Sequence, residues 1–206
     1  LRVEVTDSLD RRFVENEELR RLLAREGLLP EGQPMQEVSC QTIEECLRKH
    51  DMVRTAECFK TYQGGVCVRV TQRVPALYVV SKEGAYYVDN DRQIMPIRRT
   101  IEVDVPLFKG AVGKRAAMEE YFDFAQWIIS DRYWQSRIQY VQVVHPKHLV
   151  LHQKDDKGKI ILGDLSQYEL KLEKLQKLYA KEADYMNEMN YREFDLRYKG
   201  QVIGRK

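Results

Sequence analysis

The chain has 206 residues, of which 43% are hydrophobic and 32% charged, a balance that excludes wholesale disorder and fits one or two folded domains. Its 34 basic and 32 acidic side chains are interspersed and give a net charge of +2, so the sequence lacks the concentrated basic surface of a nucleic-acid-binding protein. No stretch approaches the roughly 18 apolar residues of a membrane-spanning helix, and no signal peptide is recognisable. Because the sequence begins at Leu1 and not at a methionine, we expect it to be part of a longer chain.

The first eighty residues predict the order strand, helix, helix, strand, strand. Residues 1–7 alternate apolar and polar side chains, which is typical of a strand. Residues 15–27 have a helical spacing of leucines, an acidic first turn and a C-terminal glycine. A second helix is expected to begin at Thr42, and the runs 55–62 and 66–74 flank a glycine-containing turn, which indicates a hairpin.

The residues that follow predict a mostly β region with two helices. The expected elements are a strand over 74–81 that closes the first region, a hairpin over 84–97 that turns at Asp89–Asp91, a helix over 113–134, a three-stranded meander over 138–144, 148–153 and 159–164, and a long helix from Ser166. The last two strands of the meander are expected to be joined by a turn at residues 156–158. The expected apolar side of the long helix consists of Tyr168, Leu172, Leu175, Tyr179 and Met186.

The sequence closes on "YREFDLRYKGQVIGRK", which has the pattern of an amphipathic strand. One predicted face carries Phe194, Leu196, Tyr198 and Val202, and the other carries Glu193, Asp195, Arg197 and Lys199. Chain ends fray unless something holds them. We therefore expect this strand either to join the sheet or to be offered to a partner.

The four cysteines lie in the first third of the chain, at Cys40, Cys46, Cys58 and Cys67. No C-x-x-C pair is present, so a zinc site is disfavoured. The alternatives that remain are small core residues and a disulfide formed in an oxidising compartment. If a disulfide forms, Cys46–Cys58 is the expected pair, because both side chains are predicted to face the space between the second helix and the sheet.

The sequence contains no motif that indicates catalysis, a metal or a cofactor. Three histidines, His145, His148 and His152, suggest a metal site, but a strand would place His145 opposite the other two, so incidental surface histidines are the preferred interpretation. The glycines of "KGAVGK" lack the spacing of a P-loop, and the paired carboxylates lie on the polar face of a predicted helix. We expect a protein that is not an enzyme.

The order of several segments resembles the FtsQ/DivIB family of bacterial cell-division proteins. The first module, ending in "VCVRVTQRVPALYVV", is similar to a POTRA domain. The segments "YYVDNDRQIMPI", "VPLFKG", "HLVLHQKDDKGKIILGD" and "FDLRYKGQVI" resemble the second domain of that family. The resemblance implies an α+β fold: a POTRA domain over residues 1–80 (β-α-α-β-β), and a mostly antiparallel β domain with two helices over residues 81–206.

The same resemblance implies a non-enzymatic scaffold on the extracytoplasmic, periplasmic side of the bacterial inner membrane, at the division septum. The full-length protein would be anchored by one membrane helix that precedes this region. Its partners would be the small bitopic coiled-coil proteins FtsB and FtsL and other divisome membrane proteins, and it would help to control septal cell-wall synthesis. The partner-binding residues implied here are Arg197, Tyr198, Lys199, Gly200 and Val202.

Two other functions remain open from the sequence. A periplasmic POTRA protein of outer-membrane assembly or secretion would share the first module, but such proteins usually continue into further POTRA modules or a barrel. A cell-wall enzyme would need titratable residues that converge in a cleft. The closing strand favours the scaffold, because an exposed strand edge can pair with a strand of a partner.

Overall fold

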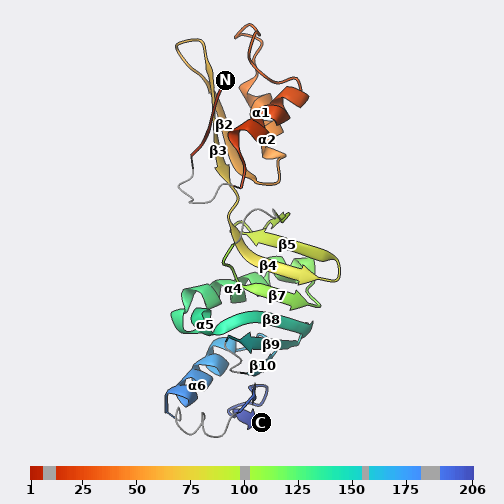
Figure 1. The fold of residues 1–206 in the computed structure, drawn as a ribbon, viewed down its shortest axis with the longest axis vertical. Coiled ribbons are helices and arrows are strands. Elements are labelled where there is room, and N and C mark those ends of the chain that lie inside the picture. Colours follow the sequence, from red (N-terminus) through yellow and green to blue (C-terminus); the bar gives the residue numbers. More distant parts are fainter. Residues whose placement is uncertain (7–12, 98–102, 155–157, 182–190) are drawn as a thin grey trace. The chain divides into compact units, whose positions relative to one another are not determined.

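The computed structural model describes residues 1–6, 13–97, 103–154, 158–181 and 191–206, and it divides the chain into two compact units (Figure 1). The first unit runs from Leu1 to Val74, and the second begins at Pro75. None of the described helices is both long enough and apolar enough to cross a membrane. Met186 and residues 156–157 of the expected turn lie outside the described residues.

The first unit has the predicted order of elements. They are β1 (Arg2–Val5), α1 (Asn16–Arg25), α2 (Cys40–Arg48), β2 (Val53–Lys60) and β3 (Val66–Gln72). The sheet order is β1-β3-β2, with β1 parallel and β2 antiparallel to β3. The β-α-α-β-β prediction is confirmed. Helix α2 begins at Cys40, two residues before the predicted Thr42, because the Ser39 hydroxyl accepts the amide of Thr42 and caps the helix (3.3 Å).

The second unit is a mixed α+β domain around one large sheet. Its elements are β4 (Pro75–Ser81), β5 (Gly84–Asp89), β6 (Ile94–Met95), β7 (Leu107–Gly110), α3 (Lys114–Met118), α4 (Glu120–Ser130), α5 (Arg132–Arg137), β8 (Ile138–His145), β9 (His148–Gln153), β10 (Lys159–Gly163), α6 (Tyr168–Lys181), β11 (Glu193–Asp195) and β12 (Ile203–Arg205). The strand order is β12-β11-β10-β9-β8-β7-β4-β5-β6. Three pairs, β4–β7, β7–β8 and β10–β11, are parallel, and the other described pairs are antiparallel.

Strand β4 belongs to the second sheet, although the sequence interpretation placed residues 75–80 in the first domain. The strand pairs with β5 on one side and with β7 on the other. The side chains of Leu77 and Val79 on β4 are fully buried in the core of the second unit. The described boundary therefore falls at Val74, because the strand is held by the core into which its apolar side chains pack.

The helix predicted over 113–134 is split into three short helices. Glu119 has φ −109° and ψ −103°, which breaks the helical backbone between α3 and α4. Asp131 is extended and begins α5, since its carboxylate accepts the amides of Tyr133 and Trp134 (2.9 and 3.2 Å). The predicted fold class, a mostly antiparallel β domain with a few helices, is confirmed. The single helix expected over 113–134 is divided into α3, α4 and α5, and α6 is the predicted long helix.

The predicted hairpin over 84–97 is confirmed as β5 and β6. A carboxylate oxygen of Asp89 accepts the amides of Asp91 and Gln93 (2.9 and 2.7 Å) and holds the turn. The acidic residues at this turn therefore serve as turn residues, as the sequence indicated.

The core of the second unit lies between the sheet and helices α4, α5 and α6, which cover one face of it (Figure 1). Phe108 on β7 is fully buried and lies 5.7 Å from the ring of Tyr121 and 6.2 Å from that of Phe124, both on α4. Side chains that alternate with the core residues, such as Lys109 and Gln142, are exposed on the opposite face. Helices therefore cover one face of the sheet, while the opposite face is exposed in part.

We predict that Phe108→Ala will lower the free energy of unfolding of the second unit by about 3–5 kcal/mol, because it removes a ring from a packed aromatic cluster. Val144→Ala on β8 is the matched control, because Val144 is 49% exposed, and it should change this free energy by no more than about 0.5 kcal/mol. Urea unfolding, followed by fluorescence, measures both. Equal losses in the two variants would contradict the assignment of the core to the helix-covered face.

Candidate partner-binding edge

The last two described strands form one end of the nine-stranded sheet. Strand β11 pairs in parallel with β10, so that Ile160 lies beside Phe194, and β12 pairs antiparallel with β11, so that Phe194 lies beside Gly204. No described strand pairs with the other side of β12. Its outward backbone groups are therefore placed to accept a further strand.

The closing segment is not the continuous strand that its alternation predicted. It is interrupted after Asp195 and resumes at Ile203, and residues 198–200 form a turn. Gly200 has φ +78°, a backbone conformation that side-chain-bearing residues rarely adopt, and this glycine was the sequence signal for the turn. The five implied partner-binding residues thus lie in the connection between β11 and β12. The edge strand itself consists of Ile203, Gly204 and Arg205, which the sequence analysis missed.

The predicted apolar face is divided between the core and the surface. Phe194 and Leu196 are buried against the α6 side of the sheet. Val202 is half-buried and packs against the same core. Tyr198 is 49% exposed, and the guanidinium of Arg197 lies 6.0 Å from the centre of its ring. Tyr198 therefore offers an aromatic surface beside the edge strand.

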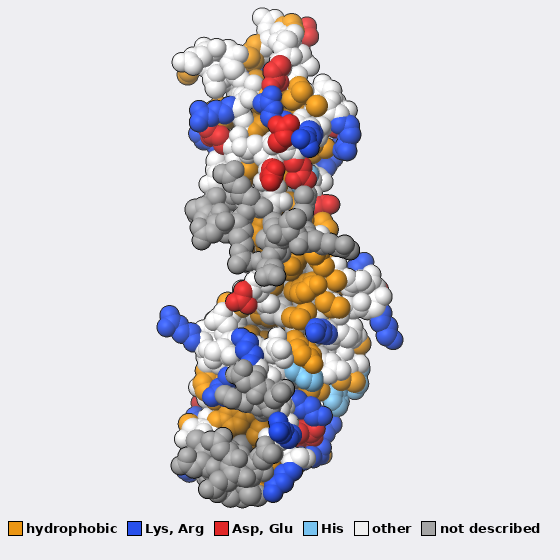
Figure 2. All heavy atoms as spheres, in the orientation of Figure 1, with side chains coloured by type: hydrophobic (Ala, Val, Ile, Leu, Met, Phe, Trp, Pro, Cys, Tyr) orange, Lys and Arg blue, Asp and Glu red, His pale blue; other side chains and the backbone are white. Residues whose placement is uncertain are grey.

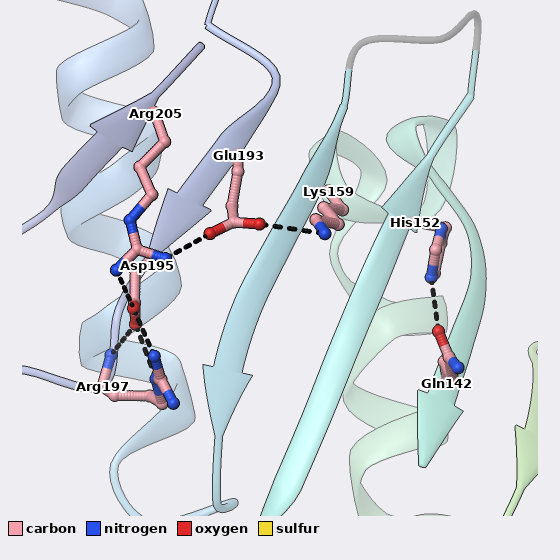
Figure 3. A network of polar contacts seen from close by, with 7 residues as sticks. All are labelled: Gln142, His152, Lys159, Glu193, Asp195, Arg197 and Arg205. Carbon is pink, nitrogen blue, oxygen red and sulfur yellow. Dashed lines mark hydrogen bonds and ion pairs between the residues drawn. The ribbon is translucent and has the colours of Figure 1, made fainter. Parts of the chain in front are cut away.

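An ion-pair network lies on the other face of β11 and links it to both neighbouring strands (Figure 3). Lys159 on β10 lies 2.9 Å from one carboxylate oxygen of Glu193, and Arg205 on β12 lies 2.7 Å from the other. Asp195 receives two bonds from the Arg197 side chain (2.9 and 2.7 Å) and lies 3.5 Å from Arg205. These contacts fix the register of the three strands by charge as well as by backbone pairing.

Asp195 is fully buried, although the alternation of the sequence predicted it on the polar face. Hydrogen bonds from the Arg197 side chain, its closest partner, lower the pKa of the Asp195 carboxyl below its usual range. A hydrogen bond from Lys159 likewise lowers the pKa of Glu193. Both carboxylates are therefore charged at neutral pH. The positive charges of Arg197 and Arg205 balance the negative charge of the buried Asp195.

Two contacts hold the turn and the edge strand in place. The ammonium group of Lys174 on α6 donates to the carbonyl oxygen of Gly200. A side chain at Gly204 would place its Cβ 2.8 Å from the ring of Tyr191, so only glycine lets that ring lie across β12. The turn is thus tied to α6, and the strand is covered by an aromatic ring on one side.

The histidines of β8 and β9 and the four cysteines are not part of this edge. His145 and His148 face each other across the β8–β9 turn, with ring centres 5.4 Å apart, and His152 stacks on Tyr140. Within the described ranges, no group of three or more histidine, cysteine, aspartate or glutamate side chains could hold a metal ion. All four cysteines are free thiols in the first unit, and Cys46 lines a groove with α1 residues.

The architecture defines a class of protein: a small β-α-α-β-β domain followed by a mixed-sheet domain whose last strand forms an open edge. Residues 1–71 match the model of the POTRA-like domain, and residues 74–205 match the model described as FtsQ/DivIB, C-terminal related. The second match covers more than half of the chain. The protein therefore belongs to the FtsQ/DivIB family, as the resemblance of its segments indicated.

A curated relative supports this membership. The chain is 34% identical over 93 residues to the cell division protein FtsQ of Salinibacter ruber (strain DSM 13855 / M31). The aligned residues are 44% of this chain and 35% of that protein. The chain thus spans about a third of the relative that it matches.

We predict that Asp195→Asn will lower the free energy of unfolding of the second unit by about 1–3 kcal/mol at neutral pH, because it removes a buried, charged hydrogen-bond acceptor. The pKa of Asp195 is lower in the folded state than in the unfolded state. The stability that its charge contributes is therefore complete above the unfolded-state pKa of about 3.9 and is lost as pH falls through the folded-state pKa. The difference between the parent chain and the variant should therefore shrink on acidification. Urea unfolding over a pH series measures it.

Asp123→Asn is the control for this prediction. Asp123 pairs with Arg92 at 2.5 Å, but its side chain is 60% exposed, so the loss should be no more than about 1 kcal/mol. A difference for Asp195→Asn that stays constant with pH, or a control that is equally destabilised, would count against the role of the buried pair.

Proposed function

We propose that this chain is a non-enzymatic scaffold of bacterial cell division whose C-terminal edge binds a strand of a small bitopic coiled-coil division protein of the FtsB or FtsL type. Through such partners it would help to control septal cell-wall synthesis, on the extracytoplasmic side of the inner membrane at the division septum. The observation that carries the proposal is the open edge of β12, on a chain that belongs to the FtsQ/DivIB family.

The backbone of β12 supports binding by strand addition. The amide of Arg192 donates to the carbonyl of Arg205, so the backbone groups of Arg205 point toward β11. Because successive residues of a strand point their backbone groups to opposite sides, those of Gly204 point outward. A partner strand added there would gain main-chain hydrogen bonds, while neighbouring side chains would select its sequence.

The side chains around the edge suit a partner strand that carries acidic and apolar residues. The segment 197–206 contains four basic residues, Arg197, Lys199, Arg205 and Lys206, and no acidic ones. Because the two arginines pair with Asp195 and Glu193, the two lysines supply the charge that an acidic partner strand would meet. The exposed ring of Tyr198 adds an aromatic contact of the kind that often dominates interface energies. Charge complementarity would steer the acidic partner to this edge, and Tyr198 would anchor it.

One groove of the first unit contains no activated nucleophile among its lining residues. This groove, of about 500 Å³, lies between α1 and α2 and contains Cys46 and His50. Burial raises the pKa of the Cys46 thiol, whereas a nucleophilic cysteine needs a lowered pKa. The Nε2 atom of His50 lies 3.1 Å from the carboxylate of Glu18. These features support a scaffold in preference to a cell-wall enzyme.

Charge distribution and the family match weigh on the remaining alternatives. Figure 2 shows basic and acidic side chains interspersed over the described residues of the face in view, which does not suggest a nucleic-acid partner. A POTRA component of outer-membrane assembly would share only the first unit, whereas residues 74–205 match the FtsQ/DivIB model.

We predict that Tyr198→Ala will weaken binding of the FtsB-type partner segment from the same organism about thirtyfold, because truncating an interface aromatic costs about 2 kcal/mol. The melting temperature should not change, since the ring is half exposed. Tyr62→Ala is the matched control: this tyrosine lies fully exposed in the first unit, and its loss should leave affinity unchanged. Calorimetric titration and thermal unfolding measure both quantities. Normal binding by Tyr198→Ala, or its unfolding, would overturn the assignment.

Leu196→Ala should behave in the opposite way. The side chain of Leu196 is 3% exposed, so its truncation leaves a cavity in the core beside β11. The backbone bond from its amide to the carbonyl of Ile161 does not involve the side chain. We expect a loss of about 2–5 kcal/mol in the free energy of unfolding, measured in urea. A variant as stable as the parent chain would show that this residue does not close the core.

A further inference from the structure

Two of the four cysteines of the first unit differ from the others in exposure. Cys40, the first residue of α2, and Cys58, on β2, are partly exposed, whereas Cys46 and Cys67 are buried. A thiol must be reached by a reagent before it can exchange with a disulfide. Exposure therefore marks Cys40 and Cys58 as the thiols that an external disulfide can reach.

Helix α2 lies along β2 with one row of side chains facing the strand. Residues four apart on a helix share a face, and Cys40, Glu44 and Arg48 form such a row. The guanidinium of Arg48 lies 3.4 Å from the carbonyl oxygen of Ala56. One turn earlier, the carboxylate of Glu44 accepts the amide of Cys58 at 2.8 Å. The same row therefore places Cys40 next to the part of β2 that carries Cys58.

The electrostatics of the Cys58 thiol agree with this placement beside Cys40. Burial raises the pKa of the Cys58 thiol to about 12, and the second cause is a hydrogen bond with the Cys40 side chain. Cys67 lies on β3 beside Phe59, while Cys58 lies beside Val68, so the Cys67 and Cys58 side chains point to opposite faces of the sheet.

Cys46 is on a different side of α2. It lines the groove between the helices with Leu22 and Arg25 of α1. It lies six positions after Cys40, which rotates its side chain about a third of a turn away from the row that faces β2. The row on α2 therefore favours Cys40 as the neighbour of Cys58, whereas the sequence analysis expected Cys46.

We propose that Cys40 and Cys58 form a redox pair that closes into a disulfide and ties the start of α2 to β2. The reaction is thiol–disulfide exchange with an external disulfide. The Cys40 thiolate attacks that disulfide, forms a mixed disulfide and releases the first external thiol. The Cys58 thiol then loses its proton and attacks the Cys40 sulfur of the mixed disulfide, which releases the second external thiol. Two protein thiols are oxidised to one disulfide, and the external disulfide is reduced to two thiols.

The bond would constrain the unfolded state of the first unit. It closes a loop that contains the whole of α2 and most of β2. Closing a loop of this length removes conformational freedom from the unfolded chain, which stabilises the folded state. The site is independent of the sheet edge at β12, so it stands or falls separately from the proposed partner binding.

The test uses the 206-residue chain, treated with oxidised glutathione in mildly alkaline buffer and then alkylated. Trypsin alone leaves Cys40 and Cys46 in one peptide, 26–48, so a second protease that cuts after Glu44 and Glu45 is needed to separate them. We expect mass spectrometry to show a Cys40–Cys58 cross-linked peptide, with Cys46 and Cys67 alkylated. The melting temperature of the first unit should rise by at least about 5 °C.

Matched variants complete the experiment. Cys40→Ser and Cys58→Ser should each abolish the cross-link and the rise in melting temperature. Cys46→Ala and Cys67→Ala should retain both. A Cys46–Cys58 peptide, glutathione adducts without an internal disulfide, or four alkylated cysteines would overturn the proposal.

Discussion

The parallel pairing of β11 with β10 is the constraint on which the C-terminal part of the second unit depends. It sets the alternation of β11, so that Phe194 and Leu196 enter the core while Asp195 faces the other way. The backbone bond from Leu196 to Ile161 extends this pairing beyond the last residue of the strand. Because β12 pairs only with β11 among the described strands, the open edge exists only where β11 has been placed correctly.

Charge compensates for the shortness of these strands. Three paired residues supply few backbone hydrogen bonds, and an isolated two-stranded hairpin is marginal in water. The contacts of Arg205 with Glu193 and Asp195 connect β12 to β11 through side chains (Figure 3). A buried carboxylate such as that of Asp195 destabilises the fold unless it is paired with a positive charge. A shift in the register of β12 would break the contacts of Arg205 with Asp195 and Glu193, and the shifted pairing would therefore be less stable. This coupling keeps a short strand in a single register.

The sequence predicted elements whose signals are local, and it failed where the deciding contact is distant. The first unit and the β5–β6 hairpin follow from periodicity, caps and turn residues. Parallel pairing has no comparable local signal, so the partners of β4 and β11 could not be read from the sequence. At the candidate site, the alternation of Phe194 and Leu196 was real, but extending it to Tyr198 and Val202 overlooked the turn at Gly200. The burial of Asp195 depends on β12, a separate strand that the prediction of one continuous closing strand did not include.

The crossover between β10 and β11 also orders events during synthesis of the chain. Antiparallel β9 can pair with β10 as soon as β10 has emerged, but the other side of β10 stays open until α6 and β11 have been made. During that interval the nascent domain presents an edge at β10, which in the finished domain is covered. An unpaired strand edge is thus present twice, first at β10 in the growing chain and later at β12. Rapid docking of α6 and β11 would shorten the period in which a strand could bind at the wrong place.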